Sequence, residues 1–211
     1  MSDSETQKTR DRERTKQKLL DAALAIIRER GFSELGVNAV AERAGVSKVL
    51  IYRYFGDLTG LYRALADVID PLQARAADRM LGELGPETGP ETLVERTIMD
   101  LHRALADDEL TKQLLIWELN HRNALTDTFS EARERTGLAM TEAFEKRLRE
   151  TTDPGDIDVH ALLALVTAGV FYLTLRSDNV SEFNGVDITT EEGWRRIART
   201  LSRLLDSYVT M

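Results

Sequence analysis

Apolar residues recur along the chain with the three- and four-residue spacing of an amphipathic helix. In the stretch from Thr15 to Gly31 they are Leu19, Ala22, Ala23, Ile26 and Ile27. This spacing places all five on one helical face. Gly31 supplies the left-handed residue with which many helices end. The pattern therefore predicts a helix that begins near Thr15 and ends at Gly31.

Two shorter helical patterns follow, separated by a glycine. The first contains Val37, Val40, Ala41 and Ala44, and the second contains Ile51 and Phe55. Gly45 lies between them, where glycine adopts a backbone conformation that a side chain would penalise. Ser47 is placed to cap the second helix, which we expect to begin there. Two short helices joined by such a turn predict a helix-turn-helix, and with the preceding helix they make a small bundle.

The rest of the chain keeps the helical pattern. A long pattern after Asp57 runs to about Leu84, and the loop from Gly82 to Pro90 follows it. Further helices are expected near residues 90–106, 109–122, 125–150, 157–176 and 190–208. We find no alternating strand pattern of useful length, so the chain is predicted to be all-α. The expected domains are a flexible basic arm over 1–14, a three-helix bundle with the helix-turn-helix over 15–56, and a larger helical effector-binding and dimerisation domain over 57–211.

The net charge of −8 is unevenly distributed along the chain. Residues 1–65 contain 12 Lys and Arg against 9 Asp and Glu, a net charge of +3, whereas the remainder contains 16 against 27, a net charge of −11. DNA phosphates are attracted by local positive charge and repelled by negative charge. Any contact with DNA is therefore expected in the N-terminal third.

Several classes of protein are disfavoured by the composition. The chain has no cysteine, which excludes a disulfide scaffold and thiolate metal sites. The longest mostly apolar run, 161–175, is shorter than the roughly 20 residues that a bilayer requires, and it predicts a buried helix and no membrane partner. The N-terminus has basic residues without a following apolar segment, so it does not resemble a secretory signal. We expect the protein in the cytoplasm.

The side chains around the second short helix have the types that read duplex DNA. Such a helix presents its N-terminal half to the major groove. Lys48, Tyr52 and Tyr54 can donate to phosphates, Arg53 can reach a guanine edge, and Val49 or Leu50 can contact a thymine methyl. The candidate DNA-binding residues are Asn38, Ser47, Lys48, Val49, Leu50, Tyr52, Arg53 and Tyr54. In the alternative interpretation, Lys48 and Arg53 are only a solvated face. We favour DNA binding because exposure of a tyrosine ring beside an arginine on a helix face is unfavourable without a partner.

Three segments together resemble a known family. They are Gly31-Phe32, Val40-Ala41-Glu42-Arg43-Ala44-Gly45-Val46-Ser47-Lys48 and Ile51-Tyr52-Arg53-Tyr54-Phe55. Over roughly residues 12–65 the chain resembles the DNA-binding domain of TetR-family (tetracycline-repressor-like) regulators. The resemblance implies a homodimer, a palindromic operator, repression, and a C-terminal helical domain that binds a small molecule and dimerises through its last two long helices.

Four positions depart from the family pattern. Leu35 and Gly36 stand where hydroxyl residues are common, Val49 replaces a small residue, and Leu58 replaces a lysine that often opens the next helix. Phosphate contact then falls to Asn38 or to a backbone group. We expect most contacts with DNA to come from the second helix and from the basic arm, which contains Lys8, Arg10, Arg12, Arg14 and Lys16.

The last two predicted helices suit a subunit interface. One is apolar nearly all round, and the other carries one apolar stripe, so both require burial on two sides. Packing within a single subunit is the alternative to a four-helix dimer interface, which we favour because operator half-sites call for a twofold protein. The candidate interface residues are Ala164, Ala168, Gly169, Trp194, Ile197, Leu201, Leu204, Leu205 and Tyr208.

An effector pocket is expected among the middle helices, with apolar walls and a few polar groups. The candidate lining residues are Met99, His102, Trp117, Asn120, His121, Phe144, Phe171, Tyr172 and Arg176. Core packing or a surface hydrogen bond is an alternative explanation for each of them. The effector's identity is not encoded in any motif that we find.

Two other functions compete with regulation of transcription. Glu118 and His121 have the Glu-x-x-His spacing of di-iron bundles, but His102 and His160 have Met99 and Ile157 in place of the second glutamate. No Gly-rich phosphate loop or serine elbow is present, so we expect no catalytic residue, no metal and no cofactor. The second alternative is a TetR-like helical protein that acts through protein contacts without binding an operator.

Overall fold

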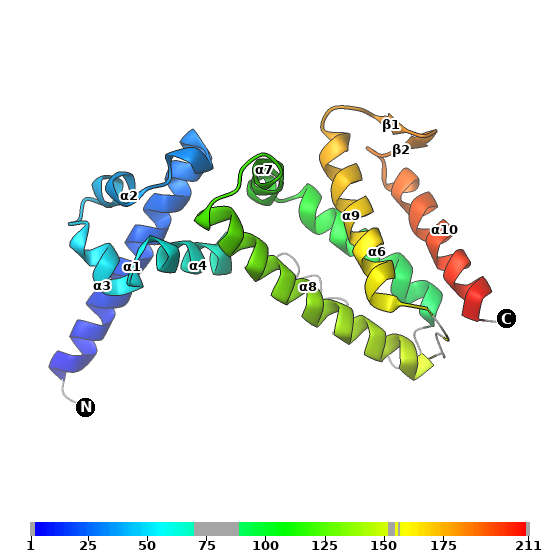
Figure 1. Ribbon diagram of the computed structural model, residues 1–211, viewed down its shortest axis with the longest axis horizontal. Coiled ribbons are helices and arrows are strands. Elements are labelled where there is room, and N and C mark those ends of the chain that lie inside the picture. Colours follow the sequence, from blue (N-terminus) through cyan, green and yellow to red (C-terminus); the bar gives the residue numbers. More distant parts are fainter. Residues whose placement is uncertain (1–2, 70–88, 152–154, 156, 210–211) are drawn as a thin grey trace. The chain divides into compact units, whose positions relative to one another are not determined.

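The structure is a computed structural model that describes residues 3–69, 89–151, 155 and 157–209 (Figure 1). The helices of the N-terminal part are α1 (Asp3–Arg30), α2 (Val37–Ala44), α3 (Val49–Phe55) and α4 (Leu58–Ile69), with a short 3-10 helix, η1, at Phe32–Glu34. The later elements are α6 (Pro90–Ala106), α7 (Glu109–Glu118), α8 (Ala124–Thr151), α9 (Val159–Ser177), β1 (Glu182–Phe183), β2 (Val186–Asp187) and α10 (Glu191–Val209). The prediction of an all-α fold class is confirmed.

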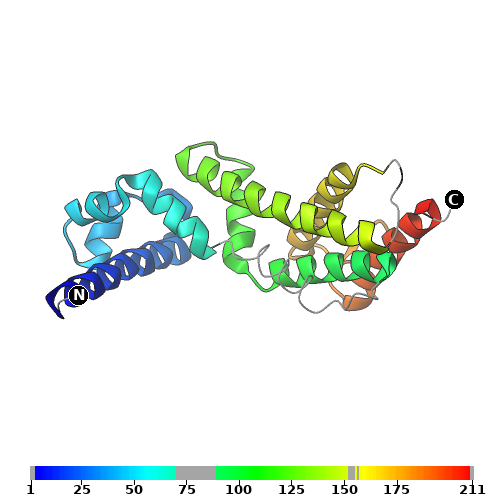
Figure 2. The same cartoon turned by 90° about the horizontal axis from the view of Figure 1, so that it is seen from below.

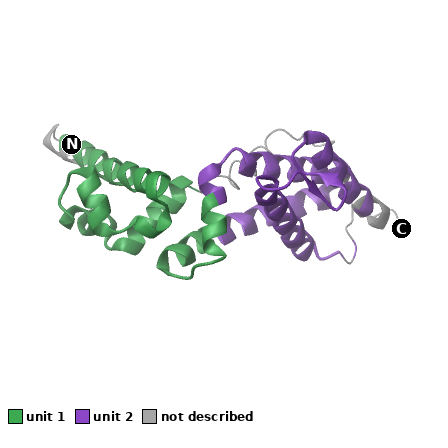
Figure 3. Cartoon of the chain, turned by 90° about the horizontal axis from the view of Figure 1, so that it is seen from above, with its two compact units in different colours: residues 1–70, 113–132 green, residues 71–112, 133–211 purple. Residues whose placement is uncertain are grey.

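The chain divides into two compact units (Figure 3). The first contains residues 1–70 and 113–132, and the second contains residues 71–112 and 133–211. The first unit therefore joins the helix-turn-helix to the end of α7 and the start of α8.

The first unit is organised around the apolar face of α1. Figure 2 shows α2, α3 and α4 along one side of this helix. The predicted stripe is confirmed: Leu19, Ala22, Ala23, Ile26 and Ile27 are all buried. They share the core with Val40, Ile51, Leu61 and Leu65, each 0% exposed. Full burial of such a side chain stabilises the fold by roughly 1.5–3 kcal/mol, so this core fixes the three short helices on α1.

Two glycines end helices where the sequence predicts. Gly31 has a φ of 84° and its N–H donates to Ile27 O over 2.8 Å. Gly45 is left-handed, with φ 62° and ψ 39°. Both conformations are strained for a side-chain-bearing residue, so glycine lets the chain reverse direction at these points.

The predicted flexible arm over residues 1–14 is wrong for the part that the structure describes. Residues 3–14 are helical and continuous with α1. Short-range contacts support this extension: the Thr15 hydroxyl donates to Asp11 O over 2.8 Å, and Lys16 lies 3.4 Å from Glu13. Pairs three and four residues apart stabilise a helix even without an apolar face, which is the signal that the prediction used.

The second unit has its core between α6, α8, α9 and α10. Ile98 of α6, Phe144 of α8, Leu163 of α9 and Trp194 of α10 belong to one buried cluster. Among the described helices of this unit, α6 and α10 pack together most extensively, and α9 also lies on α6. The predicted helices near 90–106, 125–150 and 190–208 agree with the structure within one or two residues.

A small hairpin precedes α10, which the sequence analysis did not predict. Glu182 pairs with Asp187 and Phe183 with Val186, antiparallel. Its turn is Asn184-Gly185, and both residues have positive φ, 48° and 75°. Asn-Gly is a strong signal for a tight hairpin, but two-residue strands are too short to show alternation. The first turn of α10 is capped by Thr190, whose hydroxyl accepts from the N–H of Gly193 over 3.2 Å.

Helix α9 differs from the expectation of a fully buried helix. It is long and apolar enough to cross a membrane, by length and composition alone, and 22% of its apolar window is buried. Its buried face consists of Val159, Leu163, Val166, Val170 and Thr174. The opposite face is apolar and exposed within the single chain. The predicted continuation of the helix after Ile69 and most of the loop from Gly82 lie outside the described residues.

Candidate nucleic-acid interface

Helix α3 is held by one buried side chain and presents the others. Ile51 is 0% exposed and anchors the helix in the core of the first unit. The helix begins at Val49, two residues later than expected. Ser47 still contributes to its start, because its Oγ accepts from Val49 N over 3.4 Å. The helix-turn-helix therefore fixes which side of α3 faces outward.

The outward residues of α3 combine positive charge with apolar surface. Lys48 and Arg53 are exposed, Val49 is 64% exposed and Tyr52 is 51% exposed. Leu50 and Tyr54 are half-buried, while Ser47 and Asn38 are exposed. Most of the predicted DNA-binding residues are therefore accessible to a partner, whereas Leu50 is less accessible. Contact of these residues with bases or phosphates stays a prediction.

Two departures from the family pattern are explained by the fold. Leu35 is 7% exposed and belongs to the core, where a hydroxyl residue would be a poor replacement. Gly36 is extended and serves as the N-cap of α2, its carbonyl accepting from Val40 N over 3.0 Å. These two positions therefore support α2.

An ion pair locks α2 against α1. The guanidinium of Arg43 donates to both carboxylate oxygens of Glu29, each over 2.5 Å. These hydrogen bonds hold the pKa of Glu29 below its ordinary value and raise that of Arg43. A bidentate pair constrains geometry more than a single contact does, so it helps to fix the direction from which the helix-turn-helix is presented.

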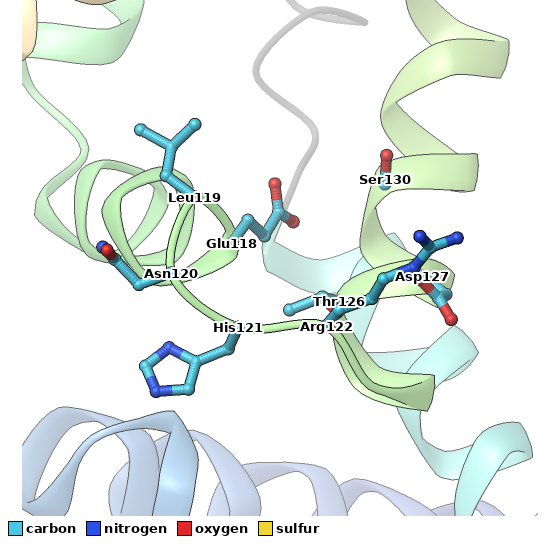
Figure 4. Close-up of a pocket in the computed structure, with 8 residues that line it drawn as sticks. All are labelled: Glu118, Leu119, Asn120, His121, Arg122, Thr126, Asp127 and Ser130. Atoms are coloured by element: carbon cyan, nitrogen blue, oxygen red, sulfur yellow. The ribbon is translucent and has the colours of Figure 1, made fainter.

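The effector candidates of the first unit gather at the turn between α7 and α8. Asn120 and His121 line a polar cavity of about 440 Å³, with Glu118, Leu119, Arg122, Thr126, Asp127 and Ser130 (Figure 4). Trp117 does not line the cavity but stacks on His121, with centroids 5.1 Å apart. His121 Nδ1 also lies 3.1 Å from Trp117 O. The cavity is polar and open, unlike the apolar pocket that was expected.

A ring stack that the apolar pattern does not predict joins this turn to the helix-turn-helix. Trp117 stacks on Phe32, with ring centroids 5.5 Å apart and planes at 21°. Phe129 of α8 meets Phe32 edge-on at 6.3 Å. Phe32 follows the glycine that ends α1, so the rings connect the α7–α8 turn to the base of α2. An aromatic residue after a helix-ending glycine was the only available signal.

The effector candidates of the second unit are not brought to one cavity. Phe144 is 1% exposed in the core, and Phe171 packs against the same core. Met99 lines a cavity of about 410 Å³ together with Thr92, Glu95, Arg96, Asp100, Arg103 and Arg195. Tyr172 and Arg176 are exposed on α9, and the Tyr172 ring meets Phe183 of the hairpin at 5.8 Å.

His102 is half-buried and belongs to a network of contacts in the second unit. Its Nδ1 lies 3.0 Å from the hydroxyl of Thr174, and its ring stacks on Trp194 at 3.8 Å between centroids. The Trp194 indole N–H donates to Ile188 O over 2.8 Å. Burial lowers the pKa of His102 to about 4, so the ring is neutral at physiological pH. These contacts give His102 a structural role in the core.

The candidate dimer residues separate into an exposed and a buried set. Ala164, Ala168 and Gly169 are exposed on α9, and Leu204 is 58% exposed on α10. Ile197 and Leu201 are partly buried against the core of their own unit. Trp194 is fully buried beside His102, so its predicted place in the interface is corrected. The side chains of Leu205 and Tyr208 lie outside the described residues.

The Glu-x-x-His pair of the metal hypothesis lies at the α7–α8 turn. His121 is exposed and Glu118 is half-buried. Among the residues that the structure describes, no group of three or more His, Cys, Asp or Glu side chains is arranged to hold a metal ion.

Comparisons with known proteins agree with this arrangement. Residues 19–65 match the family described as bacterial regulatory proteins, tetR family. The chain is 34% identical over 89 residues to the HTH-type transcriptional repressor LfrR of Mycolicibacterium smegmatis, a match that covers 42% of this chain and 44% of LfrR. It is 25% identical over 180 residues to the HTH-type transcriptional repressor KstR of Rhodococcus jostii, which covers 83% of this chain and 81% of KstR.

The fold extends the similarity beyond the helix-turn-helix. The crystal structure of the transcriptional regulator FadR from Bacillus subtilis, in complex with stearoyl-CoA, has a TM-score of 0.60 at 18% sequence identity. That similarity covers 92% of this chain and 98% of the FadR chain. The match to LfrR spans less than half of that repressor, whereas the matches to KstR and FadR cover most of each chain.

Proposed function

We propose that this chain, which belongs to the TetR family of bacterial regulatory proteins, represses transcription by binding a palindromic operator as a homodimer and leaves it when a small molecule binds. It is a helix-turn-helix transcriptional regulator and not an enzyme. The observation that carries the proposal is the exposed face of α3, in a bundle that matches the family's DNA-binding domain. As a bacterial DNA-binding regulator, it acts in the cytoplasm.

The proposed contacts follow from the side chains of this face. Lys48 and Tyr52 donate to backbone phosphates and set the position of α3 in the major groove. Arg53 donates to a guanine edge, and Val49 contacts a thymine methyl. Asn38 at the start of α2 adds a phosphate contact. The net charge of +3 over residues 1–65 brings this segment to the duplex, while the acidic remainder is repelled.

The exposed apolar face of α9 supports dimerisation. Along this face lie Ala161, Ala164, Leu165, Ala168, Gly169 and Tyr172, all exposed within one chain. Leu165 is 75% exposed, and a contiguous apolar surface of this kind marks a binding site in a water-soluble protein. The small residues let a second α9 approach closely, so the two-fold partner is a second copy of this chain.

The small-molecule response is supported by the relatives and by the ring stack. The crystal structure of FadR from Bacillus subtilis contains stearoyl-CoA, so one protein of similar fold binds a small molecule. In this chain the rings of Phe32, Trp117 and His121 link the α7–α8 turn to the end of α1. A ligand that favours one arrangement of this turn shifts the population of DNA-competent dimers.

Two experiments test this function. In the native cell, exchange of Arg53→Ala together with Tyr54→Ala is expected to raise the same transcripts as deletion of the protein, whereas Arg28→Ala changes none. If the double exchange changes no transcript, the regulator proposal fails, and a TetR-like protein that acts through protein contacts is favoured. For the effector, compounds that raise the melting temperature are expected to lower DNA binding in parallel.

A further inference from the structure

The N-terminal part of α1 and the end of α3 together line an open cavity of about 500 Å³. Its lining is Thr9, Asp11, Arg12, Thr15, Arg53 and Tyr54. We infer that this cavity, which we call the α1–α3 seat, binds one phosphodiester of the operator backbone in each half-site. The inference rests on the proposed function and extends the DNA contacts of α3 to the N-terminal part of α1.

Charge is the first reason. Arg12 and Arg53 are both exposed, and neither guanidinium forms an ion pair with another residue in the described part of the chain. Asp11 is the single carboxylate of the lining, so the seat carries a net positive charge. Guanidinium groups bind phosphate oxygens in a bidentate manner, and the Tyr54 hydroxyl adds a neutral donor.

The second reason is that Arg12 is oriented in advance. Its guanidinium carbon lies 5.9 Å from the centroid of the Tyr54 ring, a cation–π distance. The helix that carries Arg12 is anchored by Leu19, which is 0% exposed, and the Thr15 hydroxyl donates to Asp11 O over 2.8 Å. Arg12 is therefore held by a rigid element, so less side-chain entropy is lost when it binds an anion.

The position of the α1–α3 seat around α3 indicates that it contacts the DNA backbone and not the bases. Consecutive residues of an α-helix are about 100° apart, which places Tyr54 about 140° around α3 from Val49. A helix with Val49 toward the base edges therefore directs Tyr54 to the side, where the phosphates border the groove. Arg53 lies about 40° from Val49 and reaches either the groove edge or the seat.

The test is a double-mutant cycle between Arg12→Ala and neutral methylphosphonates placed singly along a selected operator duplex. For the wild-type protein, a methylphosphonate at one position in each half-site is expected to weaken binding about five- to tenfold. Arg12→Ala should weaken binding to the native duplex by a similar factor. A methylphosphonate at that one position should then not weaken binding of the Arg12→Ala protein any further. Tyr54→Phe keeps the ring beside Arg12 and should keep the coupling.

Salt dependence supplies an independent readout. Loss of one phosphate contact per half-site is expected to make the slope of log K against log[salt] shallower by about 2 for the dimer. Arg28→Ala is the matched control because Arg28 is an exposed arginine of the same helix, about 24 Å from Arg12 along its axis. The salt slope of the Arg28→Ala protein should change less than that of the Arg12→Ala protein. Arg28→Ala should also show no coupling to any methylphosphonate.

Three results would overturn the inference. If Arg12→Ala loses affinity equally on every methylphosphonate duplex, Arg12 acts as a diffuse charge and the seat does not exist. If inorganic phosphate alone raises the melting temperature of wild type but not of Arg12→Ala, and no methylphosphonate is coupled, the cavity binds free phosphate. If no operator can be selected, the proposed function fails first, which distinguishes that outcome from failure of the seat alone.

Discussion

The indole ring of Trp117 stacks on the phenyl ring of Phe32, with 5.5 Å between their centroids and 21° between their planes. Phe32 is 4% exposed and directly follows the glycine that ends α1. The contact therefore attaches α7 to the helix-turn-helix bundle within one compact unit. Because aromatic pairs contribute about 0.5–1.5 kcal/mol beyond the area they bury, this link is energetically significant.

Replacing Trp117 by leucine tests the value of the stack. Trp117→Leu is expected to lower the free energy of unfolding by about 2 kcal/mol, because both the ring contact and part of the buried area are lost. Urea unfolding followed by circular dichroism measures this change. Ile116→Ala is the matched control, since Ile116 is 49% exposed on the same helix, and its effect should stay within about 0.5 kcal/mol. Equal effects of the two exchanges would contradict the account.

Val49 gives a prediction about operator sequence. It is 64% exposed at the start of α3, so its methyl groups are available to the C5 methyl of thymine. Replacing the critical thymine by uracil removes that methyl and is expected to weaken binding about fourfold per half-site. Fluorescence anisotropy with uracil at successive positions measures the effect. Val49→Ser should bind both duplexes equally, and a Val49→Ser protein that still discriminates them would refute the assignment.

Gly169 tests the proposed dimer surface without disturbing the single chain. A Cβ built at Gly169 meets nothing within 4 Å, so a larger side chain fits its own subunit. Gly169→Arg is expected to convert the dimer into a folded monomer, because two arginines cannot be buried together at a close helix crossing. Analytical ultracentrifugation and circular dichroism report mass and helix content. Ala139→Arg places the same charge on an exposed position of α8 and should leave the dimer intact.

His102 predicts a pH dependence of stability. Burial is the largest cause that lowers its pKa from 6.5 to about 4, Arg103 adds to the shift and Asp107 opposes it. Between these two pH values the unfolded chain binds a proton that the folded chain does not. The free energy of unfolding therefore falls as pH decreases from about 6.5 to 4, by about 2 kcal/mol once partial exposure of the ring is discounted.

Chemical unfolding at pH 7 and at pH 4.5 measures this difference. His102→Gln should remove the part of the pH dependence that belongs to this residue, whatever its effect at pH 7. The explanation is wrong if the His102→Gln protein loses as much stability on acidification as wild type.

Local patterns were sufficient to predict much of the fold. Gly31 and Gly45 were placed correctly because each ends a periodic apolar stripe, and both adopt positive φ. The exposed face of α3 follows from the burial of Ile51 within the same short helix. These features depend on residues that are close in the chain, which is where periodicity and capping carry information.

Contacts between distant residues were not predictable in this way. Nothing near Trp117 indicates that its ring meets Phe32, and nothing near Arg12 indicates Tyr54. The exposed side of α9 was expected as one of two possibilities, because an apolar stretch shows that burial is required but not whether its own chain or a partner provides it. Arg12 would have remained in a flexible arm without the structure, and the α1–α3 seat depends on that correction.

Selection of binding sites from random duplex DNA by the purified full chain is the most direct test of the account. We expect a palindrome whose half-sites are centred one helical turn apart, about 34 Å, or a multiple of it. Enrichment should be lost when Lys48→Ala and Arg53→Ala are combined. Failure of the wild-type chain to enrich any sequence, or enrichment of an unrepeated half-site alone, would contradict a dimer that reads its operator through α3.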